Sequence, residues 1–219
     1  AGCAMPAEKR DPRERGGPAF PLASHNQRDS RFAGNDDNRT KTIMTHPAMS
    51  EPEETVWQGR FITTKRRGTW EYVSRSRGIG AAVILAVYNG AVVLVEQFRV
   101  PLGRNCLELP AGLIGDEQSG ETPELAAARE LEEETGFRAG RIENLGEFFS
   151  SPGMVSECFH LMRAHDLERV HAGGGVAGEE ISVHVVPLAE LDTFIAAKRS
   201  EGCGIDVKLL LLLGAKMLG

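Results

Sequence analysis

RELEEETGF, from Arg129 to Phe137, is the stretch that decides the fold of this sequence. Just before it, Thr122 can cap a helix and Pro123 suits a first helical turn, while Gly136 suits a C-terminal exit. The sequence therefore predicts a helix over Pro123 to Thr135 that carries a run of glutamates near its end.

Three of these glutamates lie on one side of the predicted helix. Glu130 and Glu134 are four residues apart, and Glu133 lies one step round from both. Neighbouring carboxylates repel one another, and a hard divalent cation such as Mg²⁺ would turn that repulsion into ligation. Taken alone, the same pattern also describes a solvated acidic helix face, so the flanking residues have to decide between the two.

The flanking residues favour the metal site. Gly115 is followed after five residues by Glu121, and after seven more by the run from Arg129 to Phe137. Together they satisfy all nine specified positions, over 23 residues, of the pattern G-x5-E-x7-R-E-U-x-E-E-x-G-U, in which U is a large apolar residue. This pattern is the signature of the Nudix hydrolases, and the chain resembles that family.

The resemblance implies a mixed α/β fold, a Nudix-like α/β/α sandwich built on a mixed β-sheet. It also implies Mg²⁺-dependent hydrolysis of a diphosphate joined to a nucleoside, with Mn²⁺ as a possible substitute. The metal ligands that it implies are Glu130, Glu133, Glu134 and the carbonyl of Ala111. It further implies that Glu121 and Arg129 pair to brace the loop and helix.

Two glycines compete for the first position of the pattern. Gly115 keeps the formal spacing, whereas Gly112 lies nine residues before Glu121 and would require three residues inserted in Asp116 to Gly120. Gly136 fills the second glycine position, at the helix end.

The rest of the ordered pattern is rich in strands. Asn89-Gly90 is a strong hairpin signal between two β-rich runs, and a central hairpin forbids an all-parallel sheet. The expected strands are Val56 to Thr64, Trp70 to Arg75, Ala81 to Tyr88, Ala91 to Phe98, Cys106 to Leu109, Ile142 to Phe149, Glu157 to Ala164 and Ile181 to Val186. Two further helices are expected at Leu188 to Lys198 and Asp206 to Leu218.

Features outside the glutamate motif are similar to the ADP-ribose pyrophosphatase branch of the family. They are Glu96 to Arg99, Glu108 to Leu113 and Ser151 to Gly153. Trp70 to Arg75 resembles the segment that carries an adenine-stacking aromatic in dimeric members. The substrate contacts expected from this resemblance are Trp70 and Glu71 on adenine, and Arg75 and Arg99 on the diphosphate, because guanidinium groups suit phosphate oxygens.

Hydrolysis also needs a base or an orienting carboxylate for the attacking water. Gly173 to Gly175 predicts a mobile loop before the strand at Ile181, and in the ADP-ribose branch a glutamate just before that strand serves as base or as a transient metal ligand. Glu179 fits best, Glu180 is second, and Glu157 is a lesser candidate that more plainly orders a loop.

The expected reaction is cleavage of ADP-ribose or a related ADP-sugar to AMP and a sugar phosphate. One alternative keeps the chemistry but changes the substrate to another nucleoside diphosphate sugar such as GDP-mannose. A second alternative is a non-catalytic Nudix module that senses ADP-ribose. Similar enzymes are homodimers in which the N-terminal strands complete the partner's adenine pocket, so a homodimer is expected here.

Composition sets the remaining expectations for this 219-residue chain, which has a formal charge of -6. The acidic balance disfavours nucleic-acid binding, no apolar run could span a membrane, and scattered cysteines favour a reduced cytoplasmic protein. Residues 1–50 are poor in large apolar side chains, which predicts a disordered tail. We expect residues 51–78 to form a small antiparallel strand region for dimerisation and adenine contact, and residues 79–219 to form the hydrolase domain.

Overall fold

The computed structural model describes residues 46–115, 120–176 and 178–217. Most of the predicted disordered tail, and most of the possible insertion at Asp116 to Gly120, lie outside the described residues. The proposed boundary between residues 51–78 and 79–219 stays a prediction.

A mixed sheet forms the centre of the fold, as the sequence predicted. Its strands are β4 (Ala81–Tyr88), β5 (Ala91–Arg99), β6 (Arg104–Glu108), β7 (Ala111–Leu113), β8 (Phe137–Phe149), β9 (Cys158–Arg169), β10 (Ile181–Pro187) and β11 (Gly204–Ile205). They run in the order β11-β6-β5-β4-β9-β8, with β10 paired to β5 and β7 paired to β4. The β4–β9 and β6–β11 pairs are parallel and the other pairs are antiparallel.

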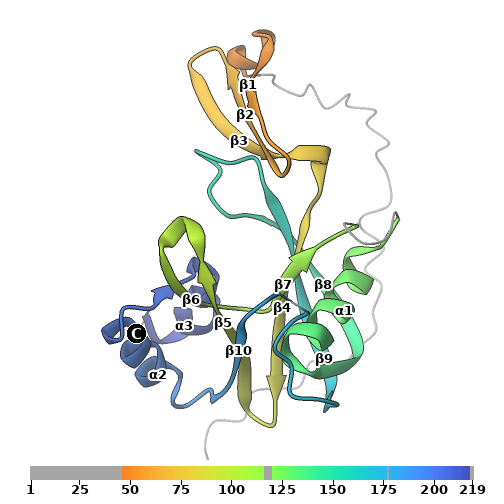
Figure 1. Ribbon diagram of the computed structural model, residues 1–219, viewed down its shortest axis with the longest axis vertical. Coiled ribbons are helices and arrows are strands. Elements are labelled where there is room, and N and C mark those ends of the chain that lie inside the picture. Colours follow the sequence, from red (N-terminus) through yellow and green to blue (C-terminus); the bar gives the residue numbers. More distant parts are fainter. Residues whose placement is uncertain (1–45, 116–119, 177, 218–219) are drawn as a thin grey trace, which may run out of the picture. The chain divides into compact units, whose positions relative to one another are not determined.

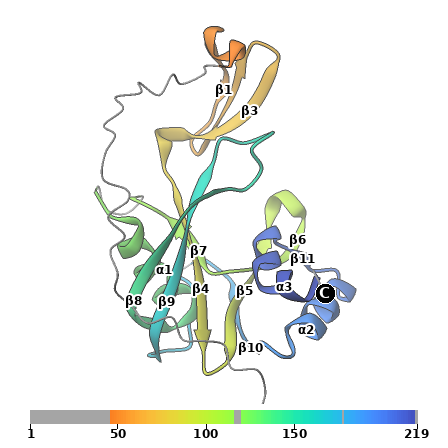
Figure 2. The ribbon, with the colours of Figure 1, turned by 180° about the vertical axis from the view of Figure 1, so that it is seen from behind.

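Helices cover both faces of this sheet (Figures 1 and 2). They are α1 (Pro123–Thr135), α2 (Leu191–Ser200) and α3 (Leu210–Met217), with short 3-10 turns η2 (Pro47–Ser50), η3 (Ser76–Gly78), η4 (Val100–Leu102) and η5 (Val207–Leu209). Leu131 of α1 packs with Ile84 in one core cluster, whereas Leu191 of α2 packs with Val83 in the other. Since Val83 and Ile84 are successive strand residues, their side chains point to opposite faces. The predicted sandwich is confirmed.

The helix α1 begins and ends where the sequence predicted. The Thr122 hydroxyl accepts a hydrogen bond from the Leu125 N–H at 3.3 Å, which satisfies one of the free donors of the first turn. Gly136 ends the helix with φ +73°, a conformation that glycine adopts without steric cost.

No helix in the described part of the chain is long and apolar enough to cross a membrane.

The central hairpin opens into a fork. Asn89 and Gly90 both have positive φ, and the β4–β5 pairing is confined to the two residue pairs next to this turn, Val87–Val92 and Tyr88–Ala91. Beyond them β4 pairs with β7 and β9, while β5 pairs with β10 and β6. The two strands therefore diverge away from the turn, toward Ala81 on one side and Arg99 on the other.

The N-terminal region is a three-stranded antiparallel sheet, β1 (Glu53–Gln58), β2 (Ile62–Arg67) and β3 (Trp70–Arg75). The single strand predicted over Val56 to Thr64 is wrong, because the chain turns between β1 and β2. Gly59 donates its N–H to the Ile62 carbonyl at 2.8 Å and closes this turn. The sheet joins the body through Val73, whose backbone bonds to Met154 and Ser156.

Candidate active site

A cavity of about 470 Å³ lies where β4 and β5 diverge. Its polar lining comes from the fork, from α1 and from more distant segments: Arg75, Gln97, Arg99, Glu108, Glu130, Glu134, Ser150, Glu157, Glu179 and Lys208. Ala111 and Gly112 of β7 form part of its wall. Three of the glutamates expected to do the chemistry, from α1 and from the strand entry before β10, are thus brought into one space.

Glu134 is the most deeply buried of these carboxylates, with 5% of the residue exposed. Burial, and to a lesser extent the nearby carboxylates of Glu130 and Glu179, raises the pKa of Glu134 to about 8. The N–H of Ala111 donates a hydrogen bond to Glu134 Oε2 at 3.1 Å, which opposes the shift. A buried carboxyl that shares its surroundings with two others is a strong candidate to bind a cation.

Glu130 lies close against β7, in the space left by the missing side chain of Gly112. A Cβ atom built on Gly112 would lie 1.9 Å from the Glu130 Cδ atom, so only glycine leaves room for this carboxylate. The two candidate glycines of the motif therefore have different roles. Gly115 has the positive φ, +78°, and donates its N–H to Glu121 at 3.1 Å, whereas Gly112 supplies space.

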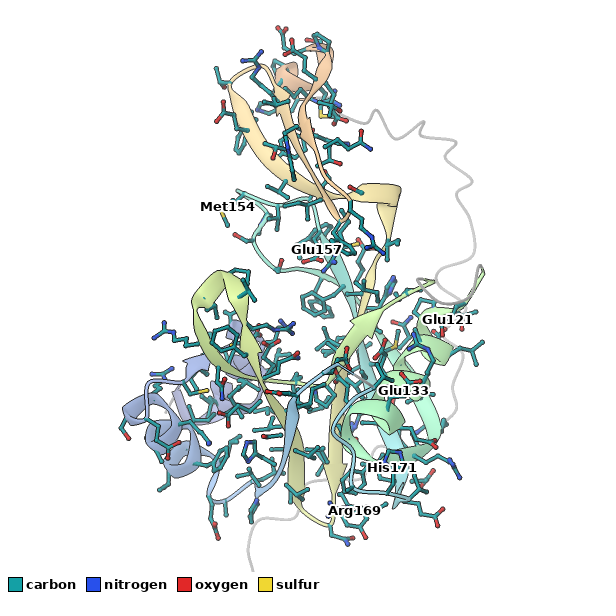
Figure 3. All side chains as sticks on the ribbon, viewed as in Figure 1. Glu121, Glu133, Met154, Glu157, Arg169 and His171 are labelled. Atoms are coloured by element: carbon teal, nitrogen blue, oxygen red, sulfur yellow. The ribbon has the colours of Figure 1, made fainter. Side chains whose placement is uncertain are left out.

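Arg129 joins the start of the motif to α1. Its guanidinium bonds to Glu121 Oε1 through Nε at 3.1 Å, and to Glu133 Oε2 through Nη1 at 3.1 Å. Arg129 and the Gly115 N–H together hold the pKa of Glu121 below its usual range. Glu133 is not among the residues that line the cavity, and Figure 3 shows it on α1 below Glu121. In this arrangement Glu133 braces Arg129.

The acidic lining fits a hard divalent cation in its chemistry. Glu130, Glu134 and Glu179 offer carboxylate oxygens, the donors that Mg²⁺ prefers, and mutual repulsion keeps the site unfavourable without a counter-charge. Among the residues that the structure describes, no three acidic, imidazole or thiol side chains converge on one point that would hold an ion. A bound ion would have to draw these carboxylates together.

Both predicted diphosphate arginines line the cavity, and each is oriented by a glutamate. Arg75, from the end of β3, pairs with Glu157. Arg99 forms two bonds to Glu108, from Nε at 2.6 Å and from Nη2 at 2.8 Å. Glu108 therefore occupies donors on the Nε and Nη2 edge of the Arg99 guanidinium. The Nη1 group is not part of this contact. Paired in this way, Glu157 is better read as a positioning residue than as a base.

The glycine loop before β10 is bonded to the end of α1, and its predicted mobility stays a prediction. Gly174 donates its N–H to the Glu134 carbonyl at 2.8 Å, and Gly175 donates to the Glu133 carbonyl at 3.1 Å. These bonds satisfy carbonyls at the end of α1. A Cβ on Gly173 would lie 2.4 Å from the Thr135 carbonyl carbon, so glycine is needed there for the close approach of the loop to α1.

The same loop places Glu179 in the cavity. Its Oε2 accepts the Val176 N–H at 3.2 Å, which holds the side chain over the loop. Glu180 is exposed and does not line the cavity. Of the two residues that the sequence ranked first and second as base, Glu179 lines the cavity and Glu180 does not, and the role of Glu179 as base stays a prediction.

Trp70 and Glu71 lie away from this cavity. Trp70 is 52% exposed and lines a separate pocket of about 390 Å³ with Met49, Tyr72 and Pro152. Trp70 and Arg75 are at opposite ends of β3, which places them roughly 17 Å apart along an extended strand. Within one chain, Trp70 therefore does not share the space in which the diphosphate residues lie.

Sequence reasoning gave no role to four polar residues of the cavity, which are Gln97, Glu108, Ser150 and Lys208. Glu108 was quoted as part of a motif but given no role, and its pairing with Arg99 depends on two neighbouring strands. Gln97, near the end of β5, was likewise quoted within a motif, Glu96 to Arg99, and given no role. Lys208 comes from the C-terminal segment, far along the chain from the motif.

Comparisons with known proteins identify a family and relatives of this chain. The NUDIX domain family matches residues 77–202. An ADP-ribose pyrophosphatase of Bacillus subtilis is 44% identical over 89 residues, which cover 40% of this chain and 46% of that protein. A GDP-mannose pyrophosphatase of Cronobacter sakazakii is 40% identical over 148 residues, which cover 63% of this chain and 72% of that protein.

One further relative by sequence and one solved structure are also similar to this chain. A methanol dehydrogenase activator of Bacillus methanolicus is 37% identical over 122 residues, covering 55% of this chain and 64% of that protein. A crystal structure of an ADP compounds hydrolase superposes with a TM-score of 0.57 at 23% identity, covering 77% of this chain and 92% of that chain, and shows a common fold. Because the family match covers more than half of the chain and includes the whole glutamate motif on α1, the protein belongs to the NUDIX family.

Proposed function

We propose that this protein is a Nudix hydrolase that uses Mg²⁺ to cleave the diphosphate of ADP-ribose or a related ADP-sugar, giving AMP and a sugar phosphate. One observation carries the proposal. The cavity at the fork gathers the carboxylates of Glu130, Glu134 and Glu179 beside the guanidinium groups of Arg75 and Arg99. Carboxylates that would hold divalent cations, beside guanidinium groups that suit phosphate oxygens, fit an anionic diphosphate.

Each group has a distinct task in the proposed reaction. Glu130, Glu134 and Glu179 would hold the divalent ions, with Glu133 and the Ala111 carbonyl as the further ligands that the family resemblance implies. The bound ions would supply charge neutralisation at the diphosphate and a lower pKa for a bound water. The protein contributes the fixed positions of these groups.

Glu179 is the proposed base. Its carboxylate lies at the cavity edge on the loop anchored to the end of α1, so it can accept a proton from a water inside the cavity. Arg75 and Arg99 hold phosphate oxygens and oppose the negative charge that develops there. Their partners Glu157 and Glu108 keep the guanidinium groups oriented before the substrate arrives.

Adenine recognition is proposed to involve a second copy of the chain. The β1–β3 sheet exposes large apolar side chains, with Trp57 at 56%, Phe61 at 60% and Trp70 at 52% exposure. Large apolar side chains left exposed on a surface favour an interface. In a homodimer that exchanges these sheets, Trp70 and Glu71 of one protomer would meet adenine bound to the other.

GDP-mannose is the second candidate substrate. The Cronobacter sakazakii relative is named for it, and its match covers more of this chain than the Bacillus subtilis match does. The carboxylate cavity serves any nucleoside diphosphate sugar, so the base-binding side chains would decide between the two substrates.

Product chromatography tests the proposal. The purified protein is incubated with Mg²⁺ and, separately, with ADP-ribose, GDP-mannose, NADH and dGTP. AMP with ribose 5-phosphate from ADP-ribose is expected, and chelation with EDTA should stop the reaction until Mg²⁺ is restored. GMP from GDP-mannose, without AMP from any adenine compound, would favour the second candidate. Binding of ADP-ribose without turnover would identify a sensor.

The variant Glu134→Gln separates catalysis from folding. It should lower turnover by orders of magnitude, because one carboxylate ligand is lost while the side-chain volume is kept. Glu180→Gln is the matched control, since Glu180 is exposed next to the same loop and outside the cavity. Equal turnover in the two variants would contradict the proposed role of Glu134.

A further inference from the structure

Lys208 brings a positive charge into the catalytic cavity from outside the matched family region. The NUDIX match ends at residue 202, yet Lys208 lines the same cavity as Glu130, Glu134 and Arg99. It belongs to η5, the short turn that leads into α3. The C-terminal segment of this chain therefore adds its own cation to the site.

The segment that carries Lys208 is firmly attached to the sheet. The strand β11 pairs in parallel with β6, and the Asp206 N–H donates to the Leu107 carbonyl at 3.0 Å. The Asp206 carboxylate then caps η5 by accepting the Lys208 N–H at 2.7 Å. Leu209 is fully buried in the core beside it. These contacts fix the backbone from which the Lys208 side chain enters the cavity.

The Lys208 ammonium is largely shielded from water. Only 17% of the side chain is exposed, and its Nζ lies 2.7 Å from Asp206 Oδ2 and 5.8 Å from the centre of the Phe159 ring. An ammonium has three N–H donors, and the Asp206 contact occupies one of them. A charge held in a partly dry cavity interacts strongly with an anion that enters it.

Neighbouring pockets indicate which part of a substrate Lys208 would meet. Arg75 and Glu157 are shared with a pocket that is also lined by the β2 and β3 strands. Lys208 and Phe159 are shared instead with a groove formed by residues of β8 and α3, such as Phe149. The cavity is therefore continuous with two neighbouring pockets, and Lys208 lies toward the one that no residue of β1–β3 lines.

We propose that Lys208 binds the sugar phosphate half of the substrate and thereby determines which second half is accepted. The inference rests on the proposed function and on the nucleoside lying on the Arg75 side of the cavity rather than on the Lys208 side. The chemistry recognised is a phosphate oxygen or a sugar hydroxyl within reach of an ammonium donor. Lys208 thus acts as a specificity-determining residue supplied by the C-terminal segment.

Product inhibition distinguishes the two halves of the substrate. Wild type and Lys208→Met are assayed with ADP-ribose and Mg²⁺, with added AMP or added ribose 5-phosphate. Methionine keeps the apolar packing on Phe159 and removes the charge. The inhibition constant for ribose 5-phosphate should rise about tenfold or more, as expected for a lost bond to a charged group, and that for AMP should change less than twofold.

Controls keep the experiment decisive. Lys198→Met is the matched control, because Lys198 is also 17% exposed and ion-paired, to Glu96 at 2.9 Å, but does not line the cavity. Lys208→Arg keeps a charge and should retain much of the ribose 5-phosphate affinity. If Lys208→Met is unfolded in a thermal melt, Lys208→Gln replaces it.

The possible results separate the inference from the proposed function. An unchanged inhibition constant for ribose 5-phosphate, or an equal rise for both products, would overturn the role of Lys208. A wild-type protein that releases no AMP from any adenosine diphosphate compound would instead overturn the proposed function. Only a selective loss of ribose 5-phosphate binding supports the inference.

Discussion

Replacing Glu134 by glutamine should stabilise the metal-free protein while it abolishes activity. The carboxyl is 5% exposed, and its pKa is raised from 4.5 to about 8 in the fold, first by burial and then by Glu130 and Glu179. Glutamine has nearly the same shape, stays neutral, and its Oε1 can still accept the Ala111 N–H. The substitution therefore removes a charge that the fold itself disfavours.

The sign of the effect follows from the raised pKa. Below pH 4.5 the carboxyl is protonated in both the folded and the unfolded chain, and its ionisation contributes nothing. Between pH 4.5 and about 8 the unfolded chain ionises more readily, so the free energy of unfolding of the wild type falls as pH rises. One pKa unit corresponds to about 1.36 kcal/mol. Because pH 7 lies about 2.5 units above 4.5 and still below the folded pKa of about 8, the free energy of unfolding is lowered by about 3 kcal/mol at pH 7. The free energy of unfolding of Glu134→Gln should not fall in this way, because glutamine does not ionise.

Urea denaturation in EDTA measures the effect. Wild type, Glu134→Gln and the exposed control Glu180→Gln are unfolded at several pH values from 5 to 8. The free energy of unfolding of Glu134→Gln should exceed that of the wild type by an amount that grows with pH. A difference that stays constant across this range would refute the reasoning, because it would show that no buried ionisation is involved. The control should follow the wild type.

Three further substitutions test other parts of the site. Gly112→Ala should abolish hydrolysis, because the added Cβ would lie 1.9 Å from the Glu130 Cδ atom and displace that carboxylate. Activity assays measure the loss and thermal melts check that the variant is folded. Full activity would show that hydrolysis does not depend on this position of the Glu130 carboxylate. Gly136→Ala should lower the free energy of unfolding by about 2 kcal/mol or more, since φ is +73° and the Cβ would lie 2.1 Å from the His171 carbonyl oxygen. Urea unfolding measures the change. An unchanged free energy of unfolding would show that alanine fits this position without strain. Trp70→Ala should raise KM for an adenine substrate about tenfold through lost stacking and leave the thermal melt nearly unchanged; an unaltered KM would remove Trp70 from the adenine site.

The sequence predicted the local parts of the fold well, because their signals lie in adjacent residues. The cap at Thr122, the proline at Pro123 and the glycine at Gly136 predicted the bounds of α1. The Asn89-Gly90 turn predicted the central hairpin, and hence a mixed sheet. The one strand predicted over Val56 to Thr64 failed because Gly59 closes a turn between two β-rich runs that lie close together in the sequence.

Only the tertiary structure decided how the candidate site is assembled. The sequence by itself determined the glutamate spacing on α1 and the family that this spacing indicates. The fold decided that Glu134 is buried, that Glu133 faces Arg129, that Glu108 holds Arg99, and that Lys208 enters the cavity. The physical reason is that burial and ion pairing arise where segments distant in sequence meet, here at the fork between β4 and β5, and no local pattern records which segments those are.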